Sequence, residues 1–452
     1  MGFEQISLPG NESMGMLGTS YLIQVGLPGL YLGPAAYGAI SGQRGGFFTV
    51  GGEIAWRQHL ISGLAMVAGI YGGGGGGSGS SVGGGLMVRP HVDLLWDLGG
   101  YQGGISASNV RFPNGSISSS QVGVVFSAGS DFSYYPPSYI GQTMDVSGRS
   151  GVGFDRVLVT AGAYRQKAAG TASARQIGYA GTRLEQFYSP QLYRGIEAVG
   201  GAGGGVAGYA EFLGTVGAET PVWDDRLAVG ARLAVGMGGG GGVSAGGGAL
   251  GKLGAYATVN LGRAVGVSFE GGYASAPTGS FRATYAAANL VWNLDHPYAP
   301  DREGTIVGNE WVVGSEHYFG ARHKDGSKRD LNAVAIKLNR YLTDSLYLTG
   351  QAHSAYSGNA GAYSAGLVGA GYHTAKFSRD LSAGAELLVG ASGGGSVDTG
   401  GAVVQPMVYV AMAMTDQVGL RLEAGRIKSV NGALDSNILD VSLSFAFGTS
   451  SR

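Results

Sequence analysis

Long stretches in which apolar and polar residues alternate are the feature that most constrains this chain. In the segment 437–447, every second residue from Leu439 to Phe447 is apolar, and the residues between them are small or polar. A β-strand points successive side chains to opposite faces, so this pattern predicts a strand with one apolar face. The segments 86–97 and 226–235 show the same alternation.

Segments of this kind cover almost the whole chain. We count twenty-three, and a weaker segment at 3–8 would make twenty-four. Most have ten residues or more, whereas strands of soluble proteins average about 5–6 residues and a strand that crosses a bilayer needs about 9–11. The sequence therefore predicts an all-β chain of membrane-spanning strands.

The same arrangement occurs three times. Glycine runs at 72–77, 238–242 and 393–395 are each followed by a strand-like segment and then by a turn at Gly115, Gly279 or Gly432. Copies that start more than 150 residues apart are too long for solenoid repeats, so each copy is a module of several strands. Three copies of an eight-strand unit account for all twenty-four segments. The predicted organisation is repeat 1 at 1–132, a linker at 133–153, repeat 2 at 154–293, a linker at 294–308 and repeat 3 at 309–452.

Connections between the predicted strands alternate in length. Very short ones, such as Gly99-Gly100 and Gly262-Arg263, alternate with longer connections rich in glycine and serine. Short turns at one end and longer loops at the other are typical of outer-membrane barrels. We expect the two linkers, which contain Tyr and Pro, to lie at the short-turn end.

The polar faces also favour a membrane barrel over a soluble β-sandwich. Charged residues are 13% of the chain, about half of the usual share, and the polar faces are rich in Gly, Ala, Ser and Thr. Backbone groups in a bilayer must all be paired, so such strands must close into a barrel. The prediction is a transmembrane antiparallel up-and-down β-barrel of about 24 strands. A soluble sandwich with an aromatic core is the alternative.

The final strand carries a resemblance. The segment 441–447, Val-Ser-Leu-Ser-Phe-Ala-Phe, resembles the closing strand of Gram-negative outer-membrane barrels, which ends on an aromatic residue; this chain runs on for five more residues. The resemblance implies a location in the cell outer membrane. Residues 1–5 show no basic or apolar signal region, so we expect a signal peptide to have been removed.

Composition and motifs exclude several kinds of chemistry. A net charge of −1 argues against a nucleic-acid partner, and the absence of cysteine excludes disulfides and thiolate metal sites. Gly246 to Lys252 has phosphate-loop spacing, but Leu253 stands where Ser or Thr is required. His91 and Asp93 could be two metal ligands, but one strand supplies too few. No cofactor and no metal are predicted.

One loop bears on enzymatic activity. The segment 111–116 faintly resembles the His-x-Ser-Asn-Gly stretch of outer-membrane lipid A deacylases, but Arg111 and Pro113 replace its His and Ser. We therefore predict that the protein is not an enzyme and keep a deacylase as the third functional hypothesis.

The alternation divides the side chains into two groups. The predicted lipid-facing residues include Val88, Val92, Leu94, Leu420, Leu422, Leu439, Val441, Leu443 and Phe445. The predicted residues lining a wet lumen of mixed charge are Glu53, Arg57, Arg89, His91, Asp93, Arg226, Arg232, Glu270, Glu386, Arg421 and Glu423. Replacement of Leu443 by arginine should therefore destabilise the barrel strongly, and replacement of Ser442 by arginine should destabilise it only mildly.

Closure of the barrel decides which function is open to the chain. Triplication allows one barrel of about 24 strands or three barrels of eight, whose interiors are only wide enough to be filled by their own side chains. Small inward residues, such as Ala234 and Gly236, are too small to fill a narrow interior and favour one wide barrel, although the long linkers favour three.

The predicted function is a pore or a secretion conduit with a water-filled or partner-filled lumen. The alternative is a scaffold barrel that houses or anchors a partner. The expected partners are outer-membrane lipid and a periplasmic or lumen-bound protein or polymer.

Overall fold

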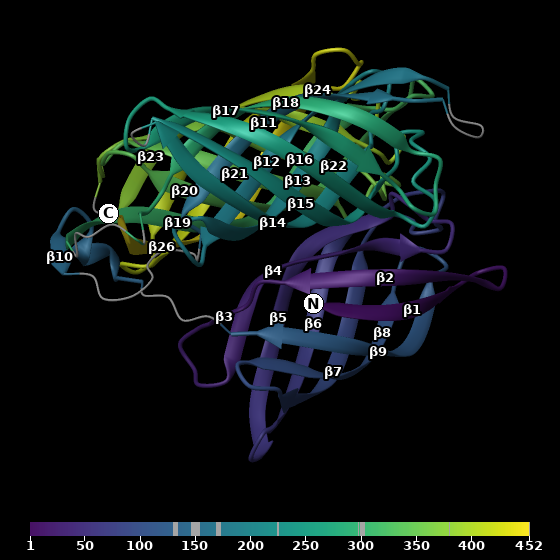
Figure 1. Ribbon diagram of the computed structural model, residues 1–452, viewed down its shortest axis with the longest axis horizontal. Coiled ribbons are helices and arrows are strands. Elements are labelled where there is room, and N and C mark those ends of the chain that lie inside the picture. The colour runs from purple at the N-terminus through teal and green to yellow at the C-terminus, as the bar shows by residue number, and fades with distance from the viewer. Residues whose placement is uncertain are drawn as a thin grey trace.

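The computed structural model describes residues 1–129, 134–145, 154–168, 173–223, 226–296, 298, 303–378 and 380–451. These residues form three separate antiparallel barrels of eight strands each (Figure 1). All-β architecture, antiparallel pairing and the total of 24 barrel strands were predicted correctly. The weak first segment is also a strand, β1.

The first barrel closes where β1 pairs with β9 and β2 pairs with β4, which places Gly2 opposite Val125. A two-residue strand, β3 (Ile23–Gln24), pairs with β4 beyond the end of β2. The eight barrel strands are β1 (Gly2–Leu8), β2 (Glu12–Ser20), β4 (Leu30–Ser41), β5 (Phe48–Ile61), β6 (Leu64–Gly76), β7 (Met87–Asp97), β8 (Tyr101–Arg111) and β9 (Ser118–Ala128).

The second barrel is closed by the pairing of its first and last strands, in which Ala161 lies opposite Ala288. Its strands are β11 (Arg156–Gln166), β12 (Arg175–Phe187), β13 (Leu192–Gly203), β14 (Ala210–Trp223), β15 (Leu227–Gly239), β16 (Ala249–Asn260), β17 (Val265–Ser275) and β18 (Arg282–Asn293).

The third barrel closes in the same way, with Ser315 opposite Val441. Its strands are β19 (Glu303–Arg322), β20 (Lys328–Tyr341), β21 (Leu346–Ala355), β22 (Ser364–His373), β23 (Leu381–Gly393), β24 (Ala402–Ala413), β25 (Val418–Ser429) and β26 (Asp435–Ser451).

The preference for a single wide barrel is therefore wrong, and tyrosine rings explain why. A Cβ added to the inward glycines Gly217, Gly230 or Gly384 would collide with the ring of Tyr193, Tyr256 or Tyr409, respectively. The small residues do not leave the interiors empty; they make room for large side chains that reach across from neighbouring strands. A narrow barrel is filled by this alternation of small and large residues.

The two ends of the barrels differ. We call the end with the longer connections, such as 42–47, 77–86 and 112–117, the loop end, and the end with connections such as 62–63 and 98–100 the turn end. The predicted linkers 133–153 and 294–308 fall partly outside the described residues. Residues 303–308 of the second linker belong to β19 and are not linker.

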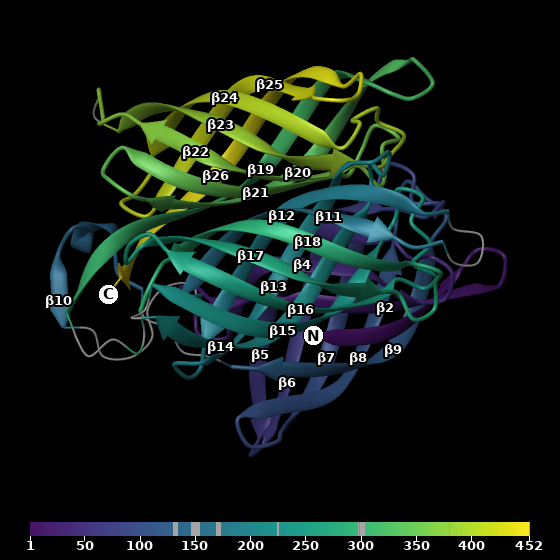
Figure 2. The ribbon, with the colours of Figure 1, turned by 45° about the horizontal axis from the view of Figure 1, so that its top comes forward.

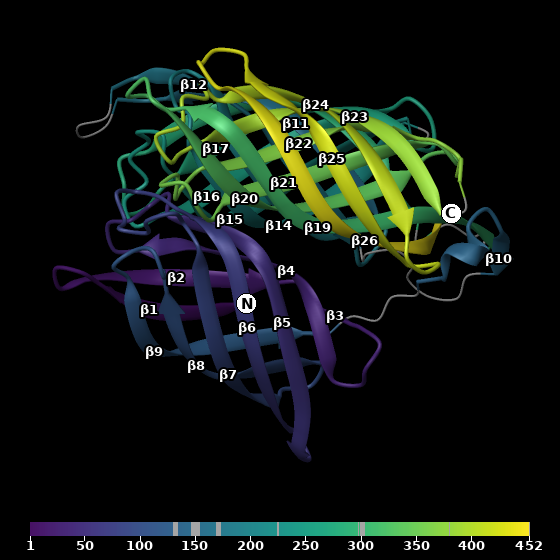
Figure 3. The same cartoon turned by 180° about the vertical axis from the view of Figure 1, so that it is seen from behind.

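The first connection binds the third barrel at the turn end. It contains a 3₁₀ helix, η1 (Pro137–Tyr139), and the short strand β10 (Thr143–Asp145). β10 pairs with the start of β19, while Tyr135 exchanges two backbone hydrogen bonds with Gly448 near the end of β26. This strap therefore holds both edges of the paired ends of β19 and β26, which extend beyond the barrel beside the C-terminus (Figures 1 and 3).

The three barrels are arranged in a ring, in which each barrel contacts the other two. β4 of the first barrel contacts β15 and β16 of the second, β12 and β13 of the second contact β22 to β24 of the third, and β20 and β21 of the third contact β5 and β6 of the first. Figure 2 shows the third barrel (yellow-green) above, the second (teal) in the middle and the first (purple) below.

The outer surface is apolar, as the alternation predicts. Val92, Leu422 and Val441 are 45%, 53% and 50% exposed, and Leu420, Leu439, Leu443 and Phe445 also point outward. Val88 and Leu94 share this face and are half-buried. Among the described residues, no helix is long and apolar enough to cross a membrane.

Candidate functional site

The interior of each barrel is closed by a cluster of apolar side chains at its loop end. In the first barrel, Phe112 and Ile117 of the loop after β8 pack with Phe47 of the loop after β4, and the Phe47 and Phe112 ring centroids are 5.9 Å apart. Phe281 and Tyr209 take part in the corresponding cluster of the second barrel, and Tyr363 and Leu434 in that of the third. We call each cluster an apolar plug.

Charged side chains fill the second barrel below its plug. Glu197 lies 2.8 Å from Arg232, 2.8 Å from Lys252 and 3.5 Å from Arg183, and it is almost completely buried. The network connects four cations to five carboxylates. Its members are Arg156, Arg183, Arg232, Lys252, Glu185, Glu197, Glu211, Glu219 and Glu270.

The third barrel has a similar but differently composed network. Arg421 lies 2.9 Å from Glu386 and 3.1 Å from both Glu310 and Glu423. Lys337 is paired with Glu423 at 2.9 Å. The Arg421 guanidinium also lies 3.9 Å from the centre of the Tyr409 ring, so the cation is held by both carboxylates and an aromatic face.

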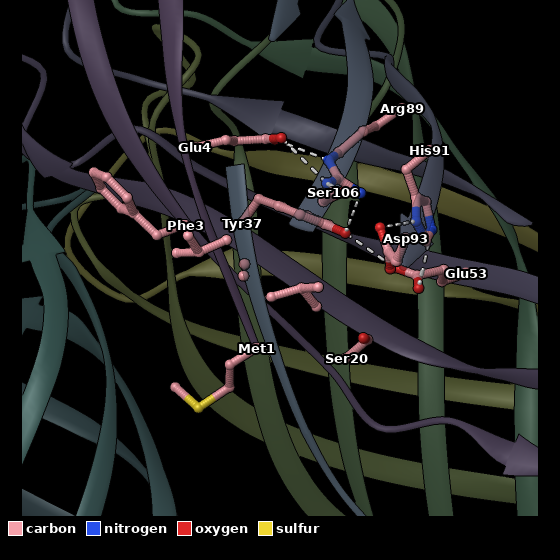
Figure 4. Close-up of a pocket in the computed structure, with 14 residues that line it drawn as sticks. Met1, Phe3, Glu4, Ser20, Tyr37, Glu53, Arg89, His91, Asp93 and Ser106 are labelled. Atoms are coloured by element: carbon pink, nitrogen blue, oxygen red, sulfur yellow. Dashed lines mark hydrogen bonds and ion pairs between the residues drawn. The ribbon is translucent and has the colours of Figure 1, made fainter. Parts of the chain in front are cut away.

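Fewer charges fill the first barrel (Figure 4). Arg89 donates to Glu4 at 2.8 Å and to the Tyr37 hydroxyl at 3.3 Å. His91 contacts Asp93 at 3.1 Å and Glu53 at 3.4 Å. Side chains from β1, β4, β5 and β7 therefore meet in this group.

A small cavity of about 40 Å³ lies next to this group. Arg89, His91 and Asp93 line one side of it, and Gly18, Ser20 and Val125, on the half of the barrel toward the turn end, line the other. The first barrel therefore holds a blind polar pocket, because its apolar plug closes the way to the loop end.

Most of the predicted lumen residues do point into the barrels, but no wet lumen surrounds them. Glu53, Arg89, His91, Asp93, Arg232, Glu270, Glu386, Arg421 and Glu423 are each at most 6% exposed. Arg57 is half-buried, and Arg226 is exposed in the turn before β15. Outside the small cavity of the first barrel, the interiors leave little space for water, because the opposite charges and tyrosines of each narrow barrel pack against one another. Arginine at Ser442 is consequently not a mild change, since Ser442 is 3% exposed and donates to Asp440.

The sequence analysis missed several members of these networks. Glu4, Arg183, Glu197, Lys252 and Lys337 are all buried inside the barrels. Each lies within a predicted strand, so assigning every charged residue of those strands to the inward face would have found them.

None of the described side chains forms a group of three or more acidic or histidine residues arranged to hold a metal ion. Arg111 and Phe112, in the segment with the deacylase-like spacing, lie at the loop end of β8, where Phe112 belongs to the apolar plug.

Comparisons with known proteins bear on the fold alone. No family model and no curated protein matches the chain. Among solved structures, Pseudomonas aeruginosa OpdQ matches with 9% identity over 99% of this chain and 95% of its own, at a TM-score of 0.24. The outer membrane channel DcaP of Acinetobacter baumannii matches with 10% identity over 95% and 97%, at 0.21. The copper transporter OprC matches with 12% identity over 98% and 80%, at 0.31. The chain's own closed barrels and apolar outer wall show an outer-membrane-type β-barrel fold.

Proposed function

We propose that this protein is a sealed outer-membrane scaffold that anchors a partner, without catalytic activity. The observation that carries the proposal is the apolar plug at the loop end of every barrel. An ion crossing any barrel would have to leave water and pass a cluster of packed aromatic and aliphatic side chains. Below each plug, buried ion pairs lie inside the barrel, densely in the second and third barrels and more sparsely in the first.

Current measurements in planar bilayers test the seal. We expect no conductance steps from the purified chain. The double substitution Phe112→Ala and Ile117→Ala removes part of the plug of the first barrel, and the matched control Phe126→Ala removes an aromatic ring from its outer wall, where Phe126 is 45% exposed. Small current steps from the plug variant only are the expected result. Regular steps from the unmodified chain would contradict the proposal.

The anchored partner is expected at the turn end, because the strap projects there. Tyr134 and Tyr139 of the strap are 52% and 39% exposed and offer aromatic faces to a protein or a polymer. Co-sedimentation with isolated cell-wall polymer tests the polymer case. Binding should fall in the double variant Tyr134→Ala and Tyr139→Ala and should be unchanged in Tyr101→Ala, a change on the barrel wall. Equal sedimentation of all three proteins would exclude the strap as the binding site.

A narrow conduit through the first barrel is the second candidate, and the blind polar pocket favours it. Only the Arg89–Glu4 and His91 contacts and the plug separate that pocket from the loop end. The equivalent plug variant of the second barrel, Phe281→Ala, should stay closed because nine charged side chains fill the space below. If the unmodified protein conducts, and if changes in the first barrel alone abolish this current, the conduit is favoured over the scaffold.

A further inference from the structure

The glycine runs lie where the barrels touch. In each barrel, the run is at the end of the fifth strand, β6, β15 or β23. That end and the loop after it meet the loop between the third and fourth strands of the neighbouring barrel. We call these three contacts the seams: 39–46 with 237–248, 200–208 with 391–401, and 354–361 with 74–85.

Backbone meets backbone in every seam. A Cβ on Gly46 would collide with the backbone of Gly240, one on Gly393 with that of Gly208, and one on Gly74 with that of Ser354. In the first seam, the Gly45 amide also donates to the Gly246 carbonyl at 2.9 Å. Small residues let backbones approach this closely, and close packing of this kind contributes to association between protein segments in a membrane.

The loop between the third and fourth strands of each barrel, which we call the entering loop, has the same backbone conformation in all three seams. Gly46, Gly208 and Ala362 have φ of +92°, +91° and +100°. The aromatic residue that follows, Phe47, Tyr209 or Tyr363, is buried in the plug of its own barrel.

Backbone hydrogen bonds repeat in the same loop. The amides of Phe47, Tyr209 and Tyr363 donate to the carbonyl three residues earlier, and their carbonyls accept from Ala39, Gly201 and Ala355, respectively. A geometry repeated to the level of single hydrogen bonds indicates one interface used three times.

The end of the fifth strand and the loop after it, which we call the receiving loop, also have the same hydrogen bond in all three barrels. Gly75 donates to the carbonyl of Gly85, Gly238 to that of Gly248, and Ser392 to that of Gly401. Each barrel thus offers one entering loop and one receiving loop, and the third barrel passes its entering loop to the first. A head-to-tail contact that closes after three units is the interface of a cyclic trimer.

We propose that the three seams are a self-sufficient interaction surface, through which the barrels recognise one another as the subunits of a trimer would. The connecting segments tether the barrels and are not needed to hold the ring. The preferred partner of each barrel face is therefore another barrel with the same pair of loops.

A single cut after folding tests this. A protease site inserted after Gly129 separates the first barrel from the strap, which stays with the remaining chain. The first barrel is then held to the rest mainly by its two seams. In mild detergent, we expect the cut protein to elute as one complex, which separates into two pieces only when boiled. Release of the first barrel from unmodified protein by the cut alone would overturn the proposal.

A matched pair of variants locates the interaction. Gly74→Val with Gly247→Val places side chains in both seams of the first barrel, and neither residue has a positive φ. Gly72→Val with Gly214→Val is the control, because both residues lie on exposed outer faces, where a Cβ would meet no atom closer than 3.8 Å. After the cut, the seam variant should lose the first barrel from the complex and the control should keep it.

Folding of the individual barrels is checked on the same material by comparing the gel mobility of unheated and boiled samples. Equal retention of the first barrel in the seam variant and the control, with all barrels folded, would also overturn the proposal. If the seam variant does not fold, the outcome of the cut on unmodified protein still decides.

Discussion

The seams and the barrel interiors have diverged to very different degrees among the three copies. At the seams, the same turn, the same buried aromatic position and the same backbone hydrogen bonds recur in all three barrels. Inside, the second barrel holds nine networked charges, whereas the first holds one smaller group beside a cavity. At a seam, the backbone of the neighbouring barrel leaves no space for larger side chains or for a different turn. A narrow interior, in contrast, can be filled by any set of side chains that balances charge and volume.

The largest expected effect comes from breaking the network of the second barrel. Glu197→Gln removes a carboxylate that faces Arg183, Arg232 and Lys252, and it leaves buried cations without their partner. We expect the free energy of unfolding to fall by about 3–5 kcal/mol. Urea unfolding followed by gel mobility measures it, and Asp435→Asn, in an exposed pair with Arg426, is the control with a loss below about 1 kcal/mol. Equal losses would show that the network does not stabilise the barrel.

The outer wall supplies the next largest effect. Leu443 is 43% exposed on the outer face of β26, so Leu443→Arg should reduce the free energy of unfolding by about 2–4 kcal/mol in a bilayer. The same change at Gly366, on the outer face of β22 with open space around it, tests whether the effect depends on depth in the membrane. Full tolerance at Leu443 would contradict a lipid-facing wall.

These regions show which features of the fold and of the candidate site the sequence could predict. Alternation is a local pattern, so it identified the strands, the outward Leu443 and the inward Arg421 and Glu423. Closure depends on which distant strands pair, such as β26 with β19, and no local pattern encodes that choice. How the interiors are filled could not be predicted for a related reason, because Tyr256 reaches over Gly230 from a neighbouring strand and a face read one strand at a time looks empty. The seams were missed because the sequence of a glycine run does not show which backbone segment the run contacts.

A smaller effect is expected from the equivalent change in the first barrel. Glu4→Gln removes the carboxylate that accepts from Arg89, but the cavity beside Arg89 gives water a place near the cation. The expected loss is about 1.5–3 kcal/mol, the range for a hydrogen bond to a charged group. Urea unfolding of the cut protein, followed by gel mobility, measures it, because the first barrel is then a separate polypeptide. A loss as large as that of Glu197→Gln would contradict the difference between the two interiors.

The smallest effect tests the repeated turn of the seams. Gly46 and Gly208 adopt positive φ without cost, but the third copy has Ala362 there, with φ of +100°. A residue with a Cβ is strained in this region, so Ala362→Gly should increase the free energy of unfolding of the third barrel by about 1 kcal/mol. Ala370→Gly, at an exposed position of β22, should instead lower it by about 0.5–1 kcal/mol, because glycine weakens an ordinary strand. Opposite signs at these two positions, read from the same unfolding curves, are the expected result. A loss at Ala362 as well would mean that the alanine methyl group contributes packing at the seam that outweighs its strain.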